Sequence, residues 1–167
     1  MLERNQVALE FAAIPENVGV SRLLVATLAG QAGFTIAEID EVKLAVSEAV
    51  TNAVVHGYNV VGADPREPGE FSAAGDLRQP AEKQVRVEVG VEAGLLTVAV
   101  IDQGRGMEDV AWAMQPAVSS DPERMGLGFA FMQSHMDSLA VDSAPGQGTR
   151  VTMTKRAGGR IAQAAAN

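Results

Sequence analysis

The chain has 167 residues, 47% of them hydrophobic and none of them cysteine, which predicts one domain with its own core and excludes disulfides, thiolate zinc sites and thiol nucleophiles. Thirteen basic against 21 acidic residues give a net charge of −8, which argues against a protein that binds nucleic acid by neutralising phosphates. No apolar run approaches the length of a membrane span and the N-terminus lacks a signal-peptide layout, so we expect a cytoplasmic protein.

The first third of the chain predicts one strand followed by two helices. Apolar residues alternate over 7–12, as in a strand, and a first helix is predicted from Pro15 to about Ala32. The apolar positions that repeat at helical spacing within it are Val20, Leu23, Leu24, Thr27 and Leu28. A second helix is predicted from about Ala37 to His56, where Gly57 ends it.

The rest of the chain predicts a loop, four strands and a third helix. Residues 60–82 carry prolines, glycines and mixed charges without periodicity, which predicts a loop or a flexible insertion. The expected strands cover 84–91, 95–102, 139–143 and 149–155, and the expected helix covers about 127–137. Residues 157–167 are expected to form a disordered tail. This order predicts an α+β fold, a two-layer sandwich with the helices packed on one face of a mixed, mostly antiparallel sheet.

The second helix carries polar residues at every fourth position of an otherwise apolar segment. Glu48, Asn52 and His56 therefore lie about one turn apart. The neighbouring face, which we expect to pack on the sheet, consists of Val42, Val46, Val50 and Ala53. The polar stripe is either the solvent-facing side of an amphipathic helix or the lining of a polar cavity. In a cavity, a glutamate can accept a proton and an asparagine amide oxygen can coordinate Mg²⁺.

A carboxylate followed by two glycines ends the strand expected at 95–102. Asp102 shares strand parity with the apolar row before it, so its side chain is expected on the core side. Gly104 and Gly106 allow the backbone to turn sharply or to approach a flat ring. The segment is therefore either an ordinary Asp-Gly turn or the floor of a pocket, in which Asp102 accepts a hydrogen bond from an exocyclic amino group.

Two further glycine motifs follow along the chain. Gly126, Leu127 and Gly128 open the third helix, where free N–H groups and the helix dipole suit a phosphate. Arg124, just before them, can add positive charge. Thr149 follows a glycine and either belongs to a plain hairpin turn or brings a hydroxyl to the same pocket. Each motif also has a purely structural explanation when it is taken alone.

Taken together and in this order, the motifs resemble those of a known family. E-x3-N on a helix, D-x-G-x-G after a strand, G-x-G at a helix start and G-T before a strand are shared by the ATP-binding domains of DNA gyrase, heat-shock chaperone ATPases, sensor histidine kinases and mismatch-repair ATPases. The resemblance covers roughly residues 6–156.

Within that superfamily the chain is most similar to the bacterial anti-sigma-factor serine kinases. The runs that carry this resemblance are LAVSEAVTNAVVHGY, PERMGLGFAFMQSHMDSLAVDS and GTRVTMTK. They look most like the anti-sigma-F factors of sporulating bacteria, with the general-stress kinases as the alternative. The insertion at 60–82 and the tail at 157–167 depart from the family pattern and leave the choice of partner open.

The resemblance implies a role for each motif residue. Glu48 would be the general base, Asn52 would bind Mg²⁺ and Asp102 would accept the adenine amino group. The other residues that would bind ATP or ADP are Gly104, Gly106, Met107, Gly126, Leu127, Gly128 and Thr149. Arg124 would stabilise charge on the transferred phosphoryl group, and Arg22 on the first helix would contact protein partners.

The resemblance also implies partner switching by a homodimer. Such a protein holds a sigma factor and uses ATP to phosphorylate a serine of the anti-anti-sigma antagonist that displaces it, so its link to transcription runs through proteins rather than nucleic acid.

Two other interpretations remain open. A sensor-kinase catalytic domain needs a phospho-accepting histidine, and the only histidines here are His56 and His135. A non-catalytic, ATP-dependent sigma-binding module would keep the nucleotide motifs without transfer, whereas the presence of Glu48 favours a kinase.

Overall fold

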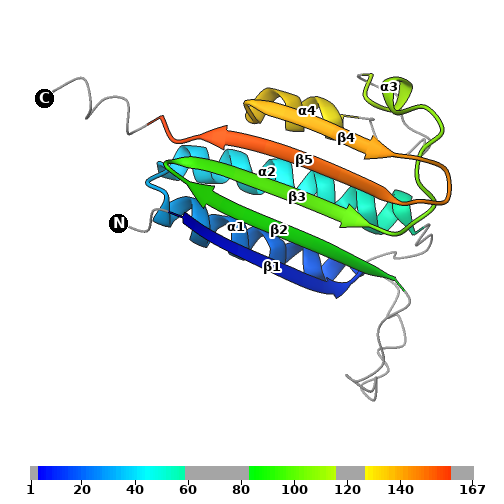
Figure 1. Cartoon of the computed structure of the whole chain (residues 1–167), viewed down its shortest axis with the longest axis horizontal. Helices are drawn as coiled ribbons and strands as arrows, with labels where there is room; N and C mark the ends of the chain where they lie inside the picture. Colours follow the sequence, from blue (N-terminus) through cyan, green and yellow to red (C-terminus); the bar gives the residue numbers. More distant parts are fainter. Residues whose placement is uncertain (1–3, 59–82, 116–126, 159–167) are drawn as a thin grey trace, which may run out of the picture.

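The computed structural model describes residues 4–58, 83–115 and 127–158. It forms two layers, a five-stranded sheet with helices on one face (Figure 1). The strands are β1 (Arg4–Ala12), β2 (Gln84–Glu92), β3 (Leu95–Asp102), β4 (Ser138–Ser143) and β5 (Thr149–Arg156). The helices are α1 (Val18–Gln31), α2 (Ile36–Asn52), α3 (Val110–Ala113) and α4 (Gly128–His135), with shorter turns η1 (Pro15–Asn17) and η2 (Ala53–Gly57). The expected insertion at 60–82 lies outside the described residues.

The sheet has the strand order β1-β2-β3-β5-β4. The predicted α+β sandwich is confirmed, and each of the expected strands is present at its predicted place. The sheet was predicted to be mixed and mostly antiparallel, and the four pairings among the described strands are all antiparallel. Short turns join β2 to β3 and β4 to β5, and turns of that length allow only antiparallel pairing.

The core lies between the sheet and the helices, and it brings the end of β3 close to the end of α2. Its buried side chains from β2, β3 and α2 include Val85, Val87, Val89, Leu96, Val98, Val100, Val42, Val46, Val50 and Ala53. The face of α2 predicted to pack on the sheet is therefore confirmed. Asp102 continues the inward-facing row of β3, so the strand places its carboxylate at the margin of the core.

Helix α1 buries only part of the apolar set that repeats at helical spacing. Its buried residues are Ser21, Val25, Leu28 and Ala29. Of the predicted apolar positions, Leu28 is buried, whereas Leu23 is 71% exposed and Val20 is 42% exposed. The reason is that apolar residues occur almost all round this helix, so their spacing does not select one face. Small residues at Ser21 and Ala29 occupy part of the buried side instead.

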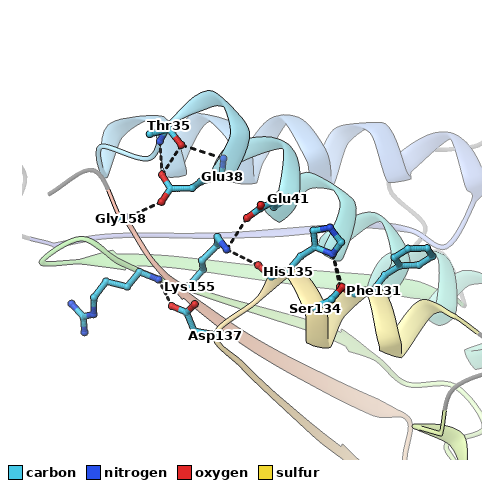
Figure 2. Close-up of polar contacts among 10 residues, drawn as sticks. Thr35, Glu38, Glu41, Phe131, Ser134, His135, Asp137, Lys155 and Gly158 are labelled. Carbon is cyan, nitrogen blue, oxygen red and sulfur yellow. Dashed lines mark hydrogen bonds and ion pairs between the residues drawn. The ribbon is translucent and has the colours of Figure 1, made fainter. Parts of the chain in front are cut away.

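Helix α2 begins at a capping box that also holds the chain after β5. The Thr35 hydroxyl accepts from the Glu38 N–H, and the Thr35 N–H donates to the Glu38 carboxylate at 2.7 Å (Figure 2). The Thr35 N–H holds the pKa of Glu38 below its ordinary value. The other carboxylate oxygen accepts from the Gly158 N–H at 2.7 Å, and Ala157 is buried. The first two residues of the expected tail are thus held in the fold, and 159–167 lie outside the described part.

Within the described ranges, no helix combines the length and the apolar character needed to cross a membrane.

Candidate functional site

A cavity of about 860 Å³ opens between the end of α2, the end of β3, the start of β5 and the start of α4. The predicted site residues that line it are Glu48, Asn52, Asp102, Gly106, Met107, Leu127, Gly128 and Thr149. These residues come from four separated parts of the chain. A volume of this size falls in the range of pockets that hold small molecules and cofactors. The polar stripe of α2 is therefore part of a cavity lining.

Asp102 forms the buried polar floor of this cavity. Its side chain is 5% exposed, and its Oδ1 accepts a hydrogen bond from the Gly104 N–H at 2.9 Å. Burial raises the pKa of the Asp102 carboxyl above its ordinary value, while hydrogen bonds from the backbone N–H groups of Gly104 and Thr149 act in the opposite direction. A carboxylate has more acceptor positions than these two bonds use, so Asp102 can accept a further donor from a ligand.

The glycines around Asp102 allow backbone segments to touch one another. A Cβ atom on Gly104 would overlap the carbonyl group of Gly57, and one on Gly148 would overlap the carbonyl oxygen of Asp102. A hydrogen bond of 2.9 Å from the Arg105 N–H to the Gly57 carbonyl oxygen fixes the first of these contacts. Gly104 thus shapes the site from behind, since it is absent from the residues that line the cavity. Gly57 was predicted only as a helix end.

Ser143 joins three parts of the cavity wall, and the sequence pattern gave no sign of this role. Its hydroxyl donates to the Gly148 carbonyl oxygen at 2.8 Å, lies 3.0 Å from the Thr149 hydroxyl oxygen, and accepts from the Met107 N–H at 2.9 Å. It therefore fixes the predicted wall residues Met107 and Thr149 relative to each other.

Tyr58 supports the loop after Asp102 from the opposite side. Its hydroxyl donates to the Gln84 carbonyl oxygen and accepts from the Gln103 N–H at 2.9 Å. The residue follows the end of η2, so the aromatic ring bridges the helix end, the start of β2 and the Asp-Gly loop. No sequence motif marks Tyr58, because its hydrogen-bond partners are distant along the chain.

The other end of the cavity brings a helix start to the polar stripe of α2. A Cβ atom on Gly128 would lie 3.1 Å from Glu48 Oε2 and 3.4 Å from Asn52 Nδ2. The first turn of α4 therefore starts directly beside both side chains, and its free N–H groups favour an anion there. The predicted pairing of a carboxylate, an amide and a glycine-rich helix start is present in three dimensions.

The chemistry of this end fits Mg²⁺ held together with phosphates. No group of three or more histidine, cysteine or acidic side chains that could hold a metal occurs among the described residues. The Asn52 amide oxygen and the Glu48 carboxylate instead offer one or two hard oxygen donors. Mg²⁺ typically takes one or two protein ligands and completes its shell with phosphate oxygens and water.

The last member of the stripe lies in a π-helical turn. Residues Ala53–Gly57 form η2 at the end of α2, and His56 also lines the cavity. A π turn contains more residues per turn than an α-helix, so it rotates His56 and Gly57 away from the positions expected from an ideal four-residue spacing. This rotation brings the Gly57 backbone against Gly104 and Asp102.

Two aromatic residues that no sequence motif indicated also line the cavity. Trp112, in the short helix α3, is 52% exposed, and Phe131 of α4 is also exposed. The Asp109 carboxylate caps α3 by accepting from the Trp112 N–H at 2.8 Å. None of the residues of α3 is buried.

Of the remaining predicted residues, Arg22 is the one that the structure describes, and it does not line this cavity. Arg124 and Gly126 lie outside the described residues. Arg22 lies on the exposed side of α1, next to the exposed Val20 and Leu23. Its place is therefore a separate surface with both apolar and cationic character.

A model of the histidine kinase-like ATPase domain matches residues 11–67 and 71–155. An anti-sigma F factor of Clostridium beijerinckii is 39% identical over 154 residues, which cover 91% of this chain and 94% of that protein. An anti-sigma F factor of Clostridium acetobutylicum is 39% identical over 158 residues, covering 93% and 96% of the two chains.

Solved structures show the same fold at lower identity. The RsbU and RsbW domains of a Mycobacterium tuberculosis protein match with a TM-score of 0.57 at 20% identity, over 91% of this chain. This chain spans 32% of that longer chain. A blue-light activated histidine kinase of Erythrobacter litoralis matches with a TM-score of 0.50 at 22% identity, over 77% of this chain and 33% of its own.

Proposed function

Since the chain belongs to the histidine kinase-like ATPase domain family and, within it, to the anti-sigma F factors, we propose that it is an ATP-dependent partner-switching kinase. In this role it holds a sporulation-type sigma factor and phosphorylates a serine of the anti-anti-sigma antagonist. The observation that carries the proposal is the single cavity into which Asp102, Glu48, Asn52 and the start of α4 all face.

ATP fits this cavity with its base at one end and its phosphates at the other. Asp102 accepts the adenine amino group, and the walls next to it are formed by Gly106, Met107 and Thr149. The N–H groups at Leu127 and Gly128, together with those at Gly126, hold the phosphates. Asn52 supplies an amide oxygen to the Mg²⁺ ion, which neutralises phosphate charge when it is bound.

Glu48 is placed to activate the serine that receives the phosphate. It takes the proton of the serine hydroxyl while that oxygen forms a bond to the γ-phosphorus. The bond between the γ-phosphorus and the β–γ bridging oxygen breaks, and ADP leaves with the electron pair. Arg124 stabilises the charge that develops on the transferred group. Most of the acceleration comes from such positioning and electrostatics.

The protein partners bind elsewhere on the molecule. Arg22 and the exposed Val20 and Leu23 of α1 form a surface suited to a protein, because a cation among apolar side chains offers both charge and buried area. The sigma factor and the antagonist compete for this surface of a homodimer. The protein acts in the cytoplasm through these partners and without contacting DNA.

The test compares the wild-type chain with Glu48→Gln in phosphoryl transfer from ATP and Mg²⁺ to an anti-anti-sigma protein of the same organism. The variant should bind ATP within about threefold of wild type, a difference of about 0.7 kcal/mol, and should transfer no phosphate. Asp40→Asn, on the exposed side of α2, is the matched control and should transfer normally.

Three outcomes of this test contradict the proposal. Normal transfer by Glu48→Gln would refute the role of Glu48 as the base. If the phosphate transferred to the antagonist is lost in acid, the product is phosphohistidine rather than phosphoserine. A wild-type chain that binds no ATP would overturn the proposal altogether.

A further inference from the structure

The described residues contain three buried polar or charged side chains, Ser21, Asp102 and Lys155. Ser21 donates to the Val18 carbonyl oxygen within α1, and Asp102 floors the cavity. Lys155 has no part in the cavity lining. It shares the inward-facing row of β5 with Val151 and Met153, where an ammonium group is costly unless it is paired.

Lys155 joins the end of α4 to the first half of α2. Its ammonium group donates to the His135 carbonyl oxygen at 2.6 Å and forms an ion pair with Glu41 Oε2 at 2.9 Å (Figure 2). His135 is the last residue of α4. A cation is favourable at a helix C-terminus, where carbonyl groups lack partners. One buried side chain thus contacts β5, α2 and α4 together.

Two further hydrogen bonds join β5 to Asp137, which follows the end of α4. The Asp137 N–H donates to the Thr154 carbonyl oxygen at 2.9 Å, and the Asp137 carboxylate accepts from the Arg156 N–H at 2.7 Å. Consecutive residues of β5 are therefore bonded to the residues that end α4 and follow it. We call this set of contacts, of which Figure 2 shows those of Lys155 and the Asp137 carboxylate, the α4 clasp.

The α4 clasp lies at the opposite end of α4 from the cavity. Helix α4 runs from Gly128 to His135, so at 1.5 Å per residue its first residue lies about 10 Å along the axis from the residue that Lys155 binds. That first residue is Gly128, beside Glu48 and Asn52. On α2, Glu41 and Glu48 are seven residues apart, which is about two turns and places them on one face. The two helices are therefore held to each other at Glu41 and meet the cavity at Glu48.

We propose that Lys155 is a positioning residue for phosphate binding, because it fixes α4 lengthwise against α2. A shift of α4 along α2 would change the separation between the N–H groups at Gly128 and the Glu48–Asn52 pair. The base end of the cavity, with Asp102 and Thr149, would stay in place because β3 and β5 hold it. This inference rests on the proposed function, since it assumes that phosphates bind at Gly128.

The test measures how much the phosphates add to binding. Lys155→Met keeps an unbranched apolar side chain and removes the ammonium group. ATP affinity with Mg²⁺ is measured by calorimetry and adenosine affinity by ligand-observed NMR, using the full chain. We expect Lys155→Met to weaken ATP binding at least tenfold and to leave adenosine binding within threefold. Lys155→Arg should restore most of the ATP affinity, and Lys43→Met, which removes a lysine paired only with Asp40, should change neither.

A loss of fold in Lys155→Met would not end the test, because Glu41→Gln removes the ion-pair partner from a more exposed position and should give a smaller loss in the same direction. Equal losses for ATP and adenosine in these variants, or an unchanged ATP-to-adenosine affinity ratio, would overturn the inference. A wild-type chain that binds neither ligand would instead overturn the proposed function.

Discussion

Replacing Asp102 by asparagine should remove adenine recognition while the fold is kept. The side chain is buried and accepts backbone N–H groups from Gly104 and Thr149. An amide has only one acceptor oxygen, so it cannot serve these donors and an adenine amino group as well. A hydrogen bond to a charged group contributes about 1.5–3 kcal/mol, which corresponds to a loss of about 10- to 100-fold in ATP affinity.

Comparing ATP with inosine triphosphate isolates this one contact. The hypoxanthine base carries a carbonyl group in place of the adenine amino group. Wild-type protein should prefer ATP by about the same 10- to 100-fold, and Asp102→Asn should lose most of that preference. Asp142→Asn, an exposed position on β4, should behave as wild type. The assignment of Asp102 is wrong if its variant keeps both the ATP affinity and the preference over inosine triphosphate.

The pH dependence gives an independent check on Asp102. Its pKa is raised in the folded state, chiefly by burial. The folded protein therefore holds a proton over a pH range in which the unfolded chain has lost it. The contribution of this group to stability is complete below the unfolded pKa and is lost as the pH rises through the folded pKa. The asparagine variant should gain stability relative to wild type across that window, as measured by urea unfolding at several pH values. Wild-type ATP affinity should fall as the pH drops through the same raised pKa.

Two other substitutions test the two ends of the cavity. Gly128→Ala places a methyl group 3.1 Å from Glu48 Oε2. The variant should keep a free energy of unfolding within about 1 kcal/mol of wild type. It should bind ATP at least tenfold more weakly and bind adenosine as wild type does. Unchanged ATP affinity in a calorimetric titration would show that phosphates do not approach this residue. Tyr58→Phe removes the hydroxyl that joins Gln84 to Gln103 and should cost about 1–3 kcal/mol in urea unfolding by leaving its partners unpaired. If the unfolding midpoint of the variant lies at the same urea concentration as that of wild type, this role is contradicted.

The buried face of a strand or helix could be predicted from the sequence wherever one face was apolar and the other polar. The alternation in β2 and β3 and the apolar face of α2 correctly predicted which side chains are buried. Helix α1 was the exception, because Val20 and Leu23 are as apolar as the residues that it buries. The side that packs carries the small residues Ser21 and Ala29, and the spacing of apolar residues in the sequence does not identify it.

The cavity was predictable in its residue types but not in the contacts that hold them. Glu48, Asn52, Asp102 and Thr149 were each identified from a short motif, and the structure brings them together. Ser143 and Tyr58 were missed because each acts through backbone groups of residues distant in the sequence. When a side chain binds main-chain atoms, the partner can be any residue type, so the sequence contains no matching residue that would reveal the contact.

The polar residues of α2 that face α4 can be explained by two different tasks on one helix. Glu48 and Asn52 lie beside the start of α4 and line the cavity. Glu41, two turns earlier, is already paired with Lys155 at the end of α4. A spacing of seven and then four residues keeps all three on the side that meets α4. Only the second interval is recognisable from the sequence, because the partner of Glu41 is supplied by β5, more than a hundred residues away.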